Sequence, residues 1–365
     1  MKKNVITIIC IVAAVILCLG LLMSVAAIGR DPENENGSGN IWGDIFDGIV
    51  DIFIPEPEPG SGIVAEIYVG DETTPYMQLT RDDVIEKMNA NYRYDENGVD
   101  ANIFSTGNGA SREHGILWKS DVRIEILSDI DIGEERLRLD TSNGGRITVN
   151  GNGHTIFNNY DHDHLMEVNT YDEGGIVILN DLRLITTCRA VLTSKFDGII
   201  LDLNGCELIN NRFEPNMYWQ NDSGLYITQS GQYNISKGTY IEATEAIVSR
   251  TGQSDIEITV NDDAWIAGGL VIDHGTGVDL NFFGMLKTNE DIGKTAYISF
   301  RNSVSDVNFT VIDAEIYGSI VSDRVPVMNL ESGTIWYDVE STEEDGTMPT
   351  ITKGEGLVIL FSGEE

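Results

Sequence analysis

Short stretches of alternating apolar and polar residues recur along most of the chain, and each ends in a bend of Asn, Asp, Gly or Ser. Ile147-Thr-Val149, for example, precedes Asn150-Gly-Asn-Gly153. Alternation predicts strands that bury one face, and Asn and Gly supply the positive-φ conformations that sharp corners need. The stretches begin at residues 147, 176, 199, 225, 256, 278, 307 and 327.

These starts lie 20–31 residues apart, a spacing typical of stacked repeats. One coil of short strands cannot bury its inward face alone, so neighbouring coils must stack on it. We therefore predict an all-β chain folded as a parallel β-helix with coils over 121–336, and the irregular coil length favours the right-handed type. The competing interpretation is two or three antiparallel β-sandwiches, which would place turns about every 8–12 residues.

The two ends of such a solenoid need covers, because an open coil exposes strand edges. Residues 63–120 are expected to cover the N-terminal end with a short helix over 80–90, where Thr80 and Asp83 are spaced as a capping box. The acidic residues 337–365 are expected to cover the other end. The helix positions predicted to face a core are Val84, Ile85 and Met88.

An uncharged apolar run of 24 residues extends from Val5 to Ile28. As a helix rising ~1.5 Å per residue, it would cross a hydrocarbon core about 30 Å thick. Lys2 and Lys3 precede it, which places the N-terminus in the cytoplasm and the remainder outside. We expect residues 1–29 to be a signal anchor of a single-pass membrane protein. The alternative is a cleaved signal peptide and a secreted protein.

Residues 30–62 have the composition of a flexible acidic stalk, rich in Pro, Gly and Ser. Residues 41–54 place Ile and Phe at helical spacing with Asp off that face, which predicts a short amphipathic helix. A helix on a membrane surface normally carries Lys or Arg on its polar face. The Asp residues therefore favour contact with protein over lipid. The body of the protein is expected over 63–365.

The charge restricts the partners, because 59 Asp and Glu against 23 Lys and Arg give a net charge of −36. Nucleic-acid binding needs basic patches, so we expect no nucleic-acid partner. Outward strand positions such as Asp202, Glu257 and Asp279 carry much of the charge. These positions predict a solvating acidic shell whose carboxylates can bind Ca²⁺. We expect the protein to require no cofactor.

The segment Gly145-Arg-Ile-Thr-Val-Asn-Gly-Asn-Gly-His-Thr-Ile156 resembles the coil signature of right-handed parallel β-helix proteins of the pectin lyase-like superfamily. The resemblance is strongest to the exported, cell-surface repeat proteins of this type, and it covers about residues 121–336. It implies the fold and leaves the activity open, because the superfamily includes pectate lyases, polygalacturonases and non-catalytic adhesins.

Polygalacturonase-like enzymes use paired aspartates as general acid and base. Asp262 and Asp263 form such a pair, and Asp273-His274-Gly275 resembles the histidine element of these enzymes, which makes Asp262, Asp263 and His274 catalytic candidates. The accompanying Asn-Thr-Asp and Arg-Ile-Lys strings are missing. The pair also occupies the bend of a repeat, where Asp is expected anyway.

Two groups of residues are candidates for binding a metal ion. His162 and His164 share one face of an extended segment and, with Glu167, could hold Zn²⁺, although a solvated loop explains the same residues. Asp129 and Asp131 place carboxylates at alternating positions, as in Ca²⁺ sites, although a strand with polar outward residues explains them equally well.

Cys188 and Cys206 are 18 residues apart, and outside the cell they could form a disulfide between successive coils. Their phases in the repeat differ, so two buried free thiols remain an open alternative. An exported chain could also carry N-linked glycans. The candidate acceptor residues are Asn36, Asn221, Asn234 and Asn308.

Together these features predict a membrane-tethered cell-surface protein with a structural or adhesive role, which binds envelope glycans or surface proteins and is not an enzyme. The alternative function is an extracellular carbohydrate-active enzyme, a polysaccharide hydrolase or lyase with carboxylates on a lateral face of the β-helix. A scaffold stabilised by Ca²⁺ or Zn²⁺ is a third interpretation.

Overall fold

The computed structural model describes most of the body of the protein. The described ranges are 62–91, 102–104, 117, 120–141, 144–160, 163–170, 174–194, 197–212, 222–287, 296–317, 319–322, 327–335, 339–341 and 351–359. The chain divides into two units, residues 1–56 and 57–365. The predicted anchor, the helix over 41–54 and the stalk up to residue 61 lie outside the described residues. Within the described ranges, no helix has the length and apolarity that a membrane span requires.

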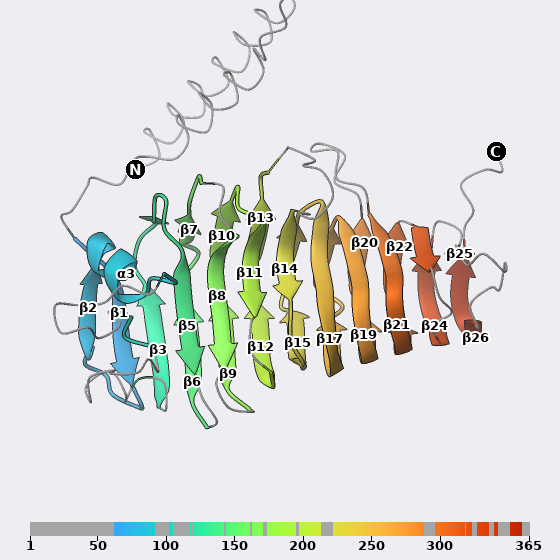
Figure 1. Cartoon of the computed structure of the whole chain (residues 1–365), viewed down its shortest axis with the longest axis horizontal. Coiled ribbons are helices and arrows are strands. Elements are labelled where there is room, and N and C mark those ends of the chain that lie inside the picture. Colours follow the sequence, from blue (N-terminus) through green and yellow to red (C-terminus); the bar gives the residue numbers. More distant parts are fainter. Residues whose placement is uncertain are drawn as a thin grey trace, which may run out of the picture. The chain divides into compact units, whose positions relative to one another are not determined.

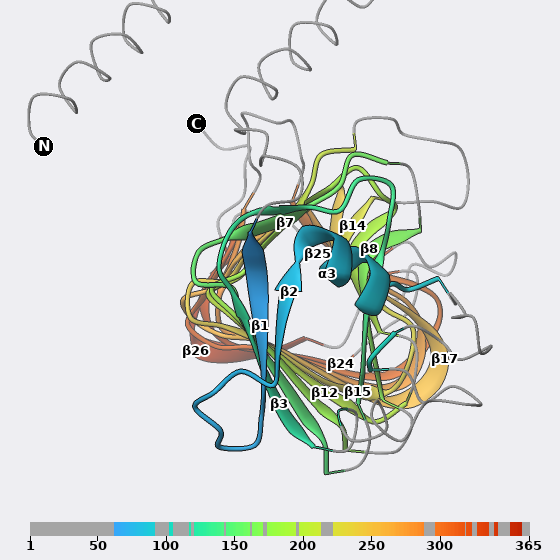
Figure 2. The same cartoon turned by 90° about the vertical axis from the view of Figure 1, so that its left-hand side faces the viewer.

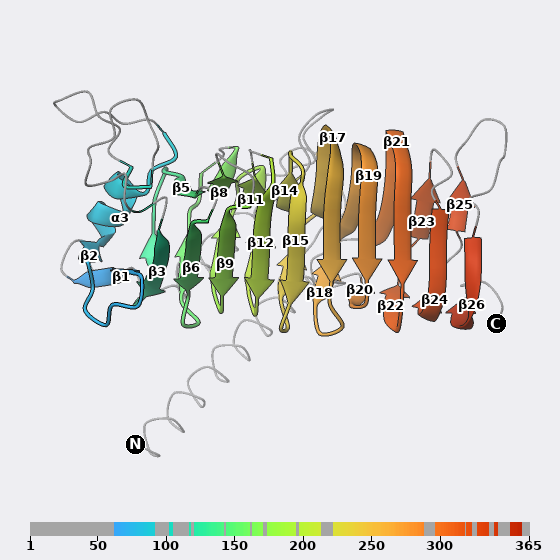
Figure 3. The ribbon, with the colours of Figure 1, turned by 90° about the horizontal axis from the view of Figure 1, so that it is seen from below.

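The strands of the second unit form three parallel ladders, which we call the first, second and third faces. In Figure 2 they surround a common core. The first face is seen in Figure 3 and pairs strands of successive coils in register. Its strands are β3 (Asp121–Ile126), β6 (Arg146–Asn150), β9 (Ile176–Asn180), β12 (Ile199–Asn204), β15 (Gly231–Ser236), the later parts of β17 (Glu245–Val260), β19 (Gly269–Phe282) and β21 (Tyr297–Val311), and the first parts of β24 (Val327–Ile335) and β26 (Ile351–Ile359).

The second face consists of shorter strands that follow the bends. They also pair in parallel from coil to coil. They are β4 (Ile130–Asp131), β7 (Thr155–Phe157), β10 (Arg183–Thr186), β13 (Glu207–Asn210), β16 (Tyr240–Glu242), β18 (Trp265–Ala267), β20 (Met285–Lys287), β22 (Ala314–Tyr317) and the later parts of β24 and β26.

The third face completes each coil, and its strands lie side by side in Figure 1. They are β5 (Leu137–Thr141), β8 (His164–Thr170), β11 (Ala190–Ser194), β14 (Ser223–Ile227), the first parts of β17, β19 and β21, then β23 (Ser319–Ser322) and β25 (Val339–Ser341). The chain is thus an all-β parallel solenoid, as the repeat predicts, and the antiparallel sandwich interpretation is wrong.

The core forms because the same strand positions point inward in every coil. Val149, Leu179, Leu203 and Ile235 are in register on successive first-face strands, and all four are buried. Burial of each such side chain contributes roughly 1.5–3 kcal/mol. No coil can obtain this contribution without its neighbours, which explains why the solenoid stacks.

One of the predicted repeat starts lies on a different face of the coil from the others. The stretch from Leu225 to Ile227 alternates like the first-face strands, but it lies in β14 on the third face. The first-face strand of that coil is β15, where Tyr233 and Ile235 are buried. Alternation reports that one side of a strand is buried and does not report which face of the coil the strand occupies.

The bends reveal a second role for asparagine. The Asn180 amide donates to Asn150 Oδ1 at 2.9 Å, and the Asn204 amide donates to Asn180 Oδ1 at 3.0 Å, which forms a ladder between coils. The positive φ angles belong instead to following residues, such as 47° at Asp181 and 65° at Gly205. These three asparagines therefore connect coils, and their neighbours turn the chain.

The N-terminal edge of the first face is occupied by a hairpin that the repeat pattern does not predict. Strand β1 (Ile63–Val69) pairs antiparallel with β3 and with β2 (Met77–Thr80). Helix α3 (Arg81–Lys87) then starts at Thr80, whose side chain accepts from the Asp83 N–H, so the predicted capping box is present. Its predicted inward positions Val84 and Met88 are buried, and Ile85 is partly buried.

At the other end, the parallel pairing continues beyond residue 336. Strand β25 pairs with β23, and β26 pairs with β24. Residues 351–359 therefore extend the ladders, in the region where the sequence predicts a separate cover.

Candidate functional site

The third face differs from an ordinary solvated β-surface because both sides of its strands are buried. Every residue of β5, β8 and β11 is buried. Residues such as Leu137 and Leu139 point into the core, and the alternate positions, which include Arg138 and Asp140, point away from it. Burying charged groups is unfavourable unless they are paired and hydrogen-bonded. This face is therefore where we place the candidate site.

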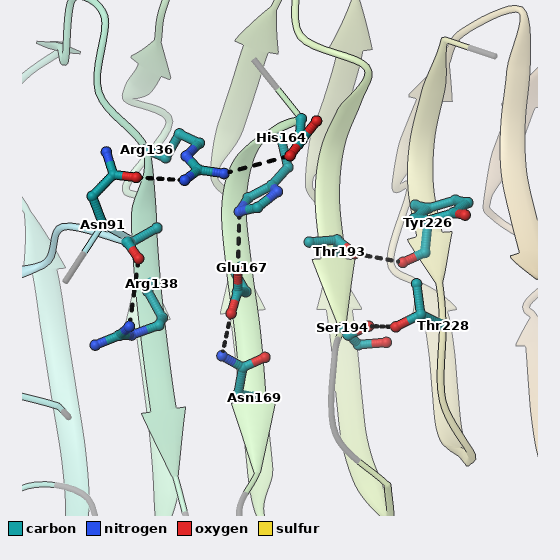
Figure 4. Close-up of polar contacts among 12 residues, drawn as sticks. Asn91, Arg136, Arg138, His164, Glu167, Asn169, Thr193, Ser194, Tyr226 and Thr228 are labelled. Atoms are coloured by element: carbon teal, nitrogen blue, oxygen red, sulfur yellow. Dashed lines mark hydrogen bonds and ion pairs between the residues drawn. The ribbon is translucent and has the colours of Figure 1, made fainter. Parts of the chain in front are cut away.

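A continuous polar network joins β5 to β8 through Asp140, and Figure 4 shows its His164, Glu167 and Asn169 part on β8. The Arg138 Nε lies 3.1 Å from Asp140 Oδ2, and Asp140 Oδ1 accepts from the Asn169 amide at 3.0 Å. The same amide nitrogen lies 2.6 Å from Glu167 Oε1. The other oxygen of Glu167 lies 3.1 Å from His164 Nε2. The network therefore brings two carboxylates together on one amide and places Arg138 at one end and His164 at the other.

The outer rim of the network is less buried and is also held by arginines. Arg136 hydrogen-bonds Asn91 in Figure 4, and its Nη1 lies 3.9 Å from an oxygen of Asp163. Arg189 Nη1 lies 3.0 Å from the other oxygen of Asp163. The exposed Asp163 carboxylate thus joins Arg136 and Arg189, the residues that precede β5 and β11, at the solvent boundary.

Further along the chain, the third-face coils carry similar ion pairs. Arg212 Nε lies 3.4 Å from Asp222, and Arg301 Nη1 lies 3.0 Å from Glu245. Arg250 Nε lies 2.6 Å from Asp273, the residue that precedes His274. The carboxylates on this face thus have cationic partners in successive coils.

The carboxylate partners raise the pKa of two of these arginines. Burial lowers the pKa of the Arg250 guanidinium, but the hydrogen bond to Asp273 and the charge of Asp273 together raise it by more. The pKa of Arg250 is therefore above its ordinary value. The same balance, with Glu245 as the main partner, leaves the pKa of Arg301 raised. Burial raises the pKa of Tyr297 to about 12, so its phenol remains a neutral donor.

This arrangement suits binding better than acid–base catalysis. A carboxylate beside a guanidinium is held in its ionised form, whereas a general acid needs a raised pKa. The buried groups hold neighbouring coils together, and the exposed rim pair of Arg189 and Asp163 is the part of the network that can hydrogen-bond a ligand.

The catalytic candidates from the sequence do not lie together. Asp262 and Asp263 are exposed in the bend between β17 and β18, at the corner between the first and second faces. His274 lies in β19, where it pairs with Arg250 of β17 and Ser303 of β21, between the third-face and first-face parts of the strand. The aspartates thus occupy the bend position that the repeat alone explains.

The metal candidates have structural partners. His164 and Glu167 contact each other, and His162 lies outside the described residues. Asp129 accepts from the Thr155 N–H at 2.8 Å, and Asp131 accepts from the Gly133 N–H at 2.7 Å. Over the ranges that the structure describes, no three His, Cys, Asp or Glu side chains are grouped to hold a metal ion.

Both cysteines of the solenoid are buried free thiols in the structure, rather than a disulfide. Cys188 Sγ donates to the Tyr160 carbonyl and Cys206 Sγ to the Leu179 carbonyl, each at 3.2 Å. Burial raises the pKa of the Cys206 thiol to about 11.

We expect both thiols to resist alkylation at pH 8 in the native protein, because the thiolate is the reactive form and reagents cannot reach them. Peptide mapping after treatment with iodoacetamide should find Cys188 and Cys206 unmodified. Guanidinium alone should make both reactive, and native reactivity of Cys206 should rise only as the pH approaches 11. A requirement for reductant before labelling would instead reveal a disulfide.

The described glycosylation candidates are engaged in coil-to-coil hydrogen bonds. The Asn234 amide donates to Asp202, and the Asn308 amide donates to Asp279, both at 2.8 Å. Asn308 is exposed and Asn234 is half-buried. Asn36 and Asn221 lie outside the described residues. Glycosylation stays a prediction at all four.

Comparisons with known proteins give no match: no family model, no curated protein and no solved structure is similar to this chain. We therefore infer function from the residues themselves. The sequence did not indicate Arg138, Asp140, Asp222 or Glu245, because Leu137-Arg-Leu-Asp-Thr141 alternates like any solvated strand. Their burial is the signal, and it exists only in the folded protein.

Proposed function

We propose that this chain is an exported, cell-surface, right-handed parallel β-helix that is tethered by residues 1–29 and binds envelope glycans or surface proteins along its lateral faces. The observation that carries the proposal is the parallel stacking, because it repeats the same outward strand positions from coil to coil and so forms long lateral faces. At the edge of the third face, the exposed pair of Arg189 and Asp163 holds polar groups at fixed positions on that surface. Parallel crossovers between β-strands are right-handed in about 98% of cases, which supports the hand.

Other features support the proposed location at the cell surface. Lys2 and Lys3 before the apolar run from Val5 to Ile28 favour an extracellular body. Helix α3 and the β1–β2 hairpin are suited to cover the N-terminal end of the solenoid, where an exposed edge would invite aggregation. The function requires no cofactor, and the acidic shell favours Ca²⁺ over nucleic acid as a partner.

One observation favours the alternative, a carbohydrate-active enzyme. Asp140 and Glu167 accept from the same Asn169 nitrogen, so two carboxylates are close together on a lateral face, as glycoside hydrolysis requires. The burial of Asp140 and Glu167 opposes this reading, because a polysaccharide in solvent does not reach side chains that are 0% and 6% exposed.

The test uses intact cells that produce the full chain with a C-terminal tag. We expect the tag to be in the membrane fraction and to be cleaved by external protease. The variant V15D/L17D adds two charges to the apolar run, and we expect it to abolish both the membrane association and the cleavage. Purified chain should bind envelope polysaccharide without releasing reducing ends. A protease-protected tag would overturn the proposed address. Release of reducing ends that E167Q abolishes would favour the enzyme.

A further inference from the structure

A row of outward side chains on the second face contains an exposed aromatic pair. Glu207, Tyr240, Trp265 and Met285 occupy the same register position on β13, β16, β18 and β20. Trp265 is 37% exposed, which is unusual for so large an apolar side chain. Tyr240 and Met285 beside it are half-buried. The row therefore presents an apolar strip to solvent across successive coils.

The two rings form one surface. The centroids of Tyr240 and Trp265 are 4.7 Å apart, and the ring planes are tilted by 52°. Parallel strands are about 4.8 Å apart, so the rings follow the coil spacing. Rings held in this way lose little conformational freedom on binding, because their positions are set by the backbone.

Polar groups surround the strip at fixed positions. The Tyr240 hydroxyl donates to Glu242, two residues further along β16. One coil away, Arg183 Nε donates to Glu207 Oε2 at 2.7 Å, and both side chains are exposed by about two fifths. Aromatic faces beside fixed carboxylate and guanidinium groups match a ligand that has apolar C–H faces and a rim of hydroxyl groups.

We propose that Tyr240 and Trp265 are a binding platform for a neutral pyranose polysaccharide, whose sugar faces stack on the rings while its hydroxyls bond the exposed Glu207 and Arg183. This inference rests on the proposed lateral-binding function and names its ligand class and its face. The platform is separate from the third-face network, because its strands belong to a different ladder.

The surrounding charge selects a neutral ligand. Glu207, Glu242, Asp263 and Glu315 lie on or next to this face, and the whole chain carries a net charge of −36. A polyuronate or sulfated glycan would be repelled. A second protein copy is a poorer fit, because two rings and a methionine fall far short of the roughly 1,000 Å² that a stable interface buries.

The experiment is affinity electrophoresis and titration calorimetry of the full chain in a detergent that contains no sugar. The probes are soluble galactomannan, hydroxyethyl cellulose and polygalacturonate. We expect at least one neutral polymer to retard the wild-type chain and polygalacturonate to have no effect. W265A should weaken binding about tenfold or more, the loss that a central aromatic contact causes. Y240A should weaken it several-fold, and Y240F less than Y240A.

The matched control is Y76A, which removes an exposed tyrosine that precedes β2, away from the second face. It should bind like the wild type, and the melting temperatures of all variants should agree. Three results would overturn the inference: wild-type binding that W265A leaves unchanged, binding of polyuronate only, or no polysaccharide binding. If W265A leaves wild-type binding unchanged, the proposed glycan binding still holds, but the binding surface is on another face of the solenoid. If W265A instead dissociates a dimer, the strip is a self-association surface and the inference is wrong.

Discussion

Replacement of Arg138 by methionine is expected to lower the free energy of unfolding by about 3–5 kcal/mol. Arg138 is 2% exposed and its partner Asp140 is fully buried, with Nε and Oδ2 3.1 Å apart. Methionine fills much of the same volume but leaves the Asp140 charge in the interior without the guanidinium. Removal of one member of a buried pair costs more than the pair itself contributes, because the remaining charge stays desolvated.

The control is the double variant R138M/D140L, which removes both charges. It should recover most of the lost stability, since an apolar replacement of a buried pair is often neutral. Urea unfolding followed by circular dichroism measures all three proteins and D140L alone. If R138M costs less than about 1 kcal/mol, or if the double variant is as unstable as the two single changes together, the pair is not the buried interaction described.

Gly268→Ala is expected to lower the free energy of unfolding by about 3 kcal/mol or more, through backbone strain and overpacking. Gly268 has a φ of +136°, in a region of backbone conformation that residues with a side chain rarely adopt. A Cβ atom there would lie 1.9 Å from the carbonyl oxygen of Ala243 in the preceding coil. Since that oxygen belongs to the backbone, the coils must move apart.

Gly153→Ala is the matched control. Its φ is +76°, but a Cβ atom there would meet nothing within 4 Å. Gly153→Ala should lower the free energy of unfolding by only about 1–2 kcal/mol, which is the cost of backbone strain without overpacking. Thermal and urea unfolding of both variants separate the two terms. Equal losses would mean that the coils at Gly268 can separate freely, contrary to the packing described.

The features that sequence reasoning identified correctly are local ones. The capping box of Thr80 and Asp83 needs only residues three positions apart. The first-face strands follow from alternation over five or six residues, and the parallel stacking follows because no single coil can bury its apolar side. The bend position of Asp262 and Asp263 likewise follows from the local repeat, and their role as catalytic candidates stays a prediction.

The features that sequence reasoning missed depend on which coil lies beside which. Leu225 was grouped with the other repeat starts although it lies on the third face, because alternation does not distinguish the faces. The asparagine ladder through Asn150 and Asn180 joins residues 30 positions apart. The disulfide was left open because sequence separation does not specify how Cys188 and Cys206 are oriented.

The sequence by itself determined the solenoid, since period-two burial, bend residues and repeat length are properties of neighbouring residues in the chain. The tertiary structure alone decided which polar residues are buried and which apolar ones are exposed. Arg138 and Trp265 both occupy outward strand positions, yet one is 2% exposed and the other 37%. The physical reason is that exposure depends on what packs against the outer surface of each face, and strand alternation carries no information about that surface.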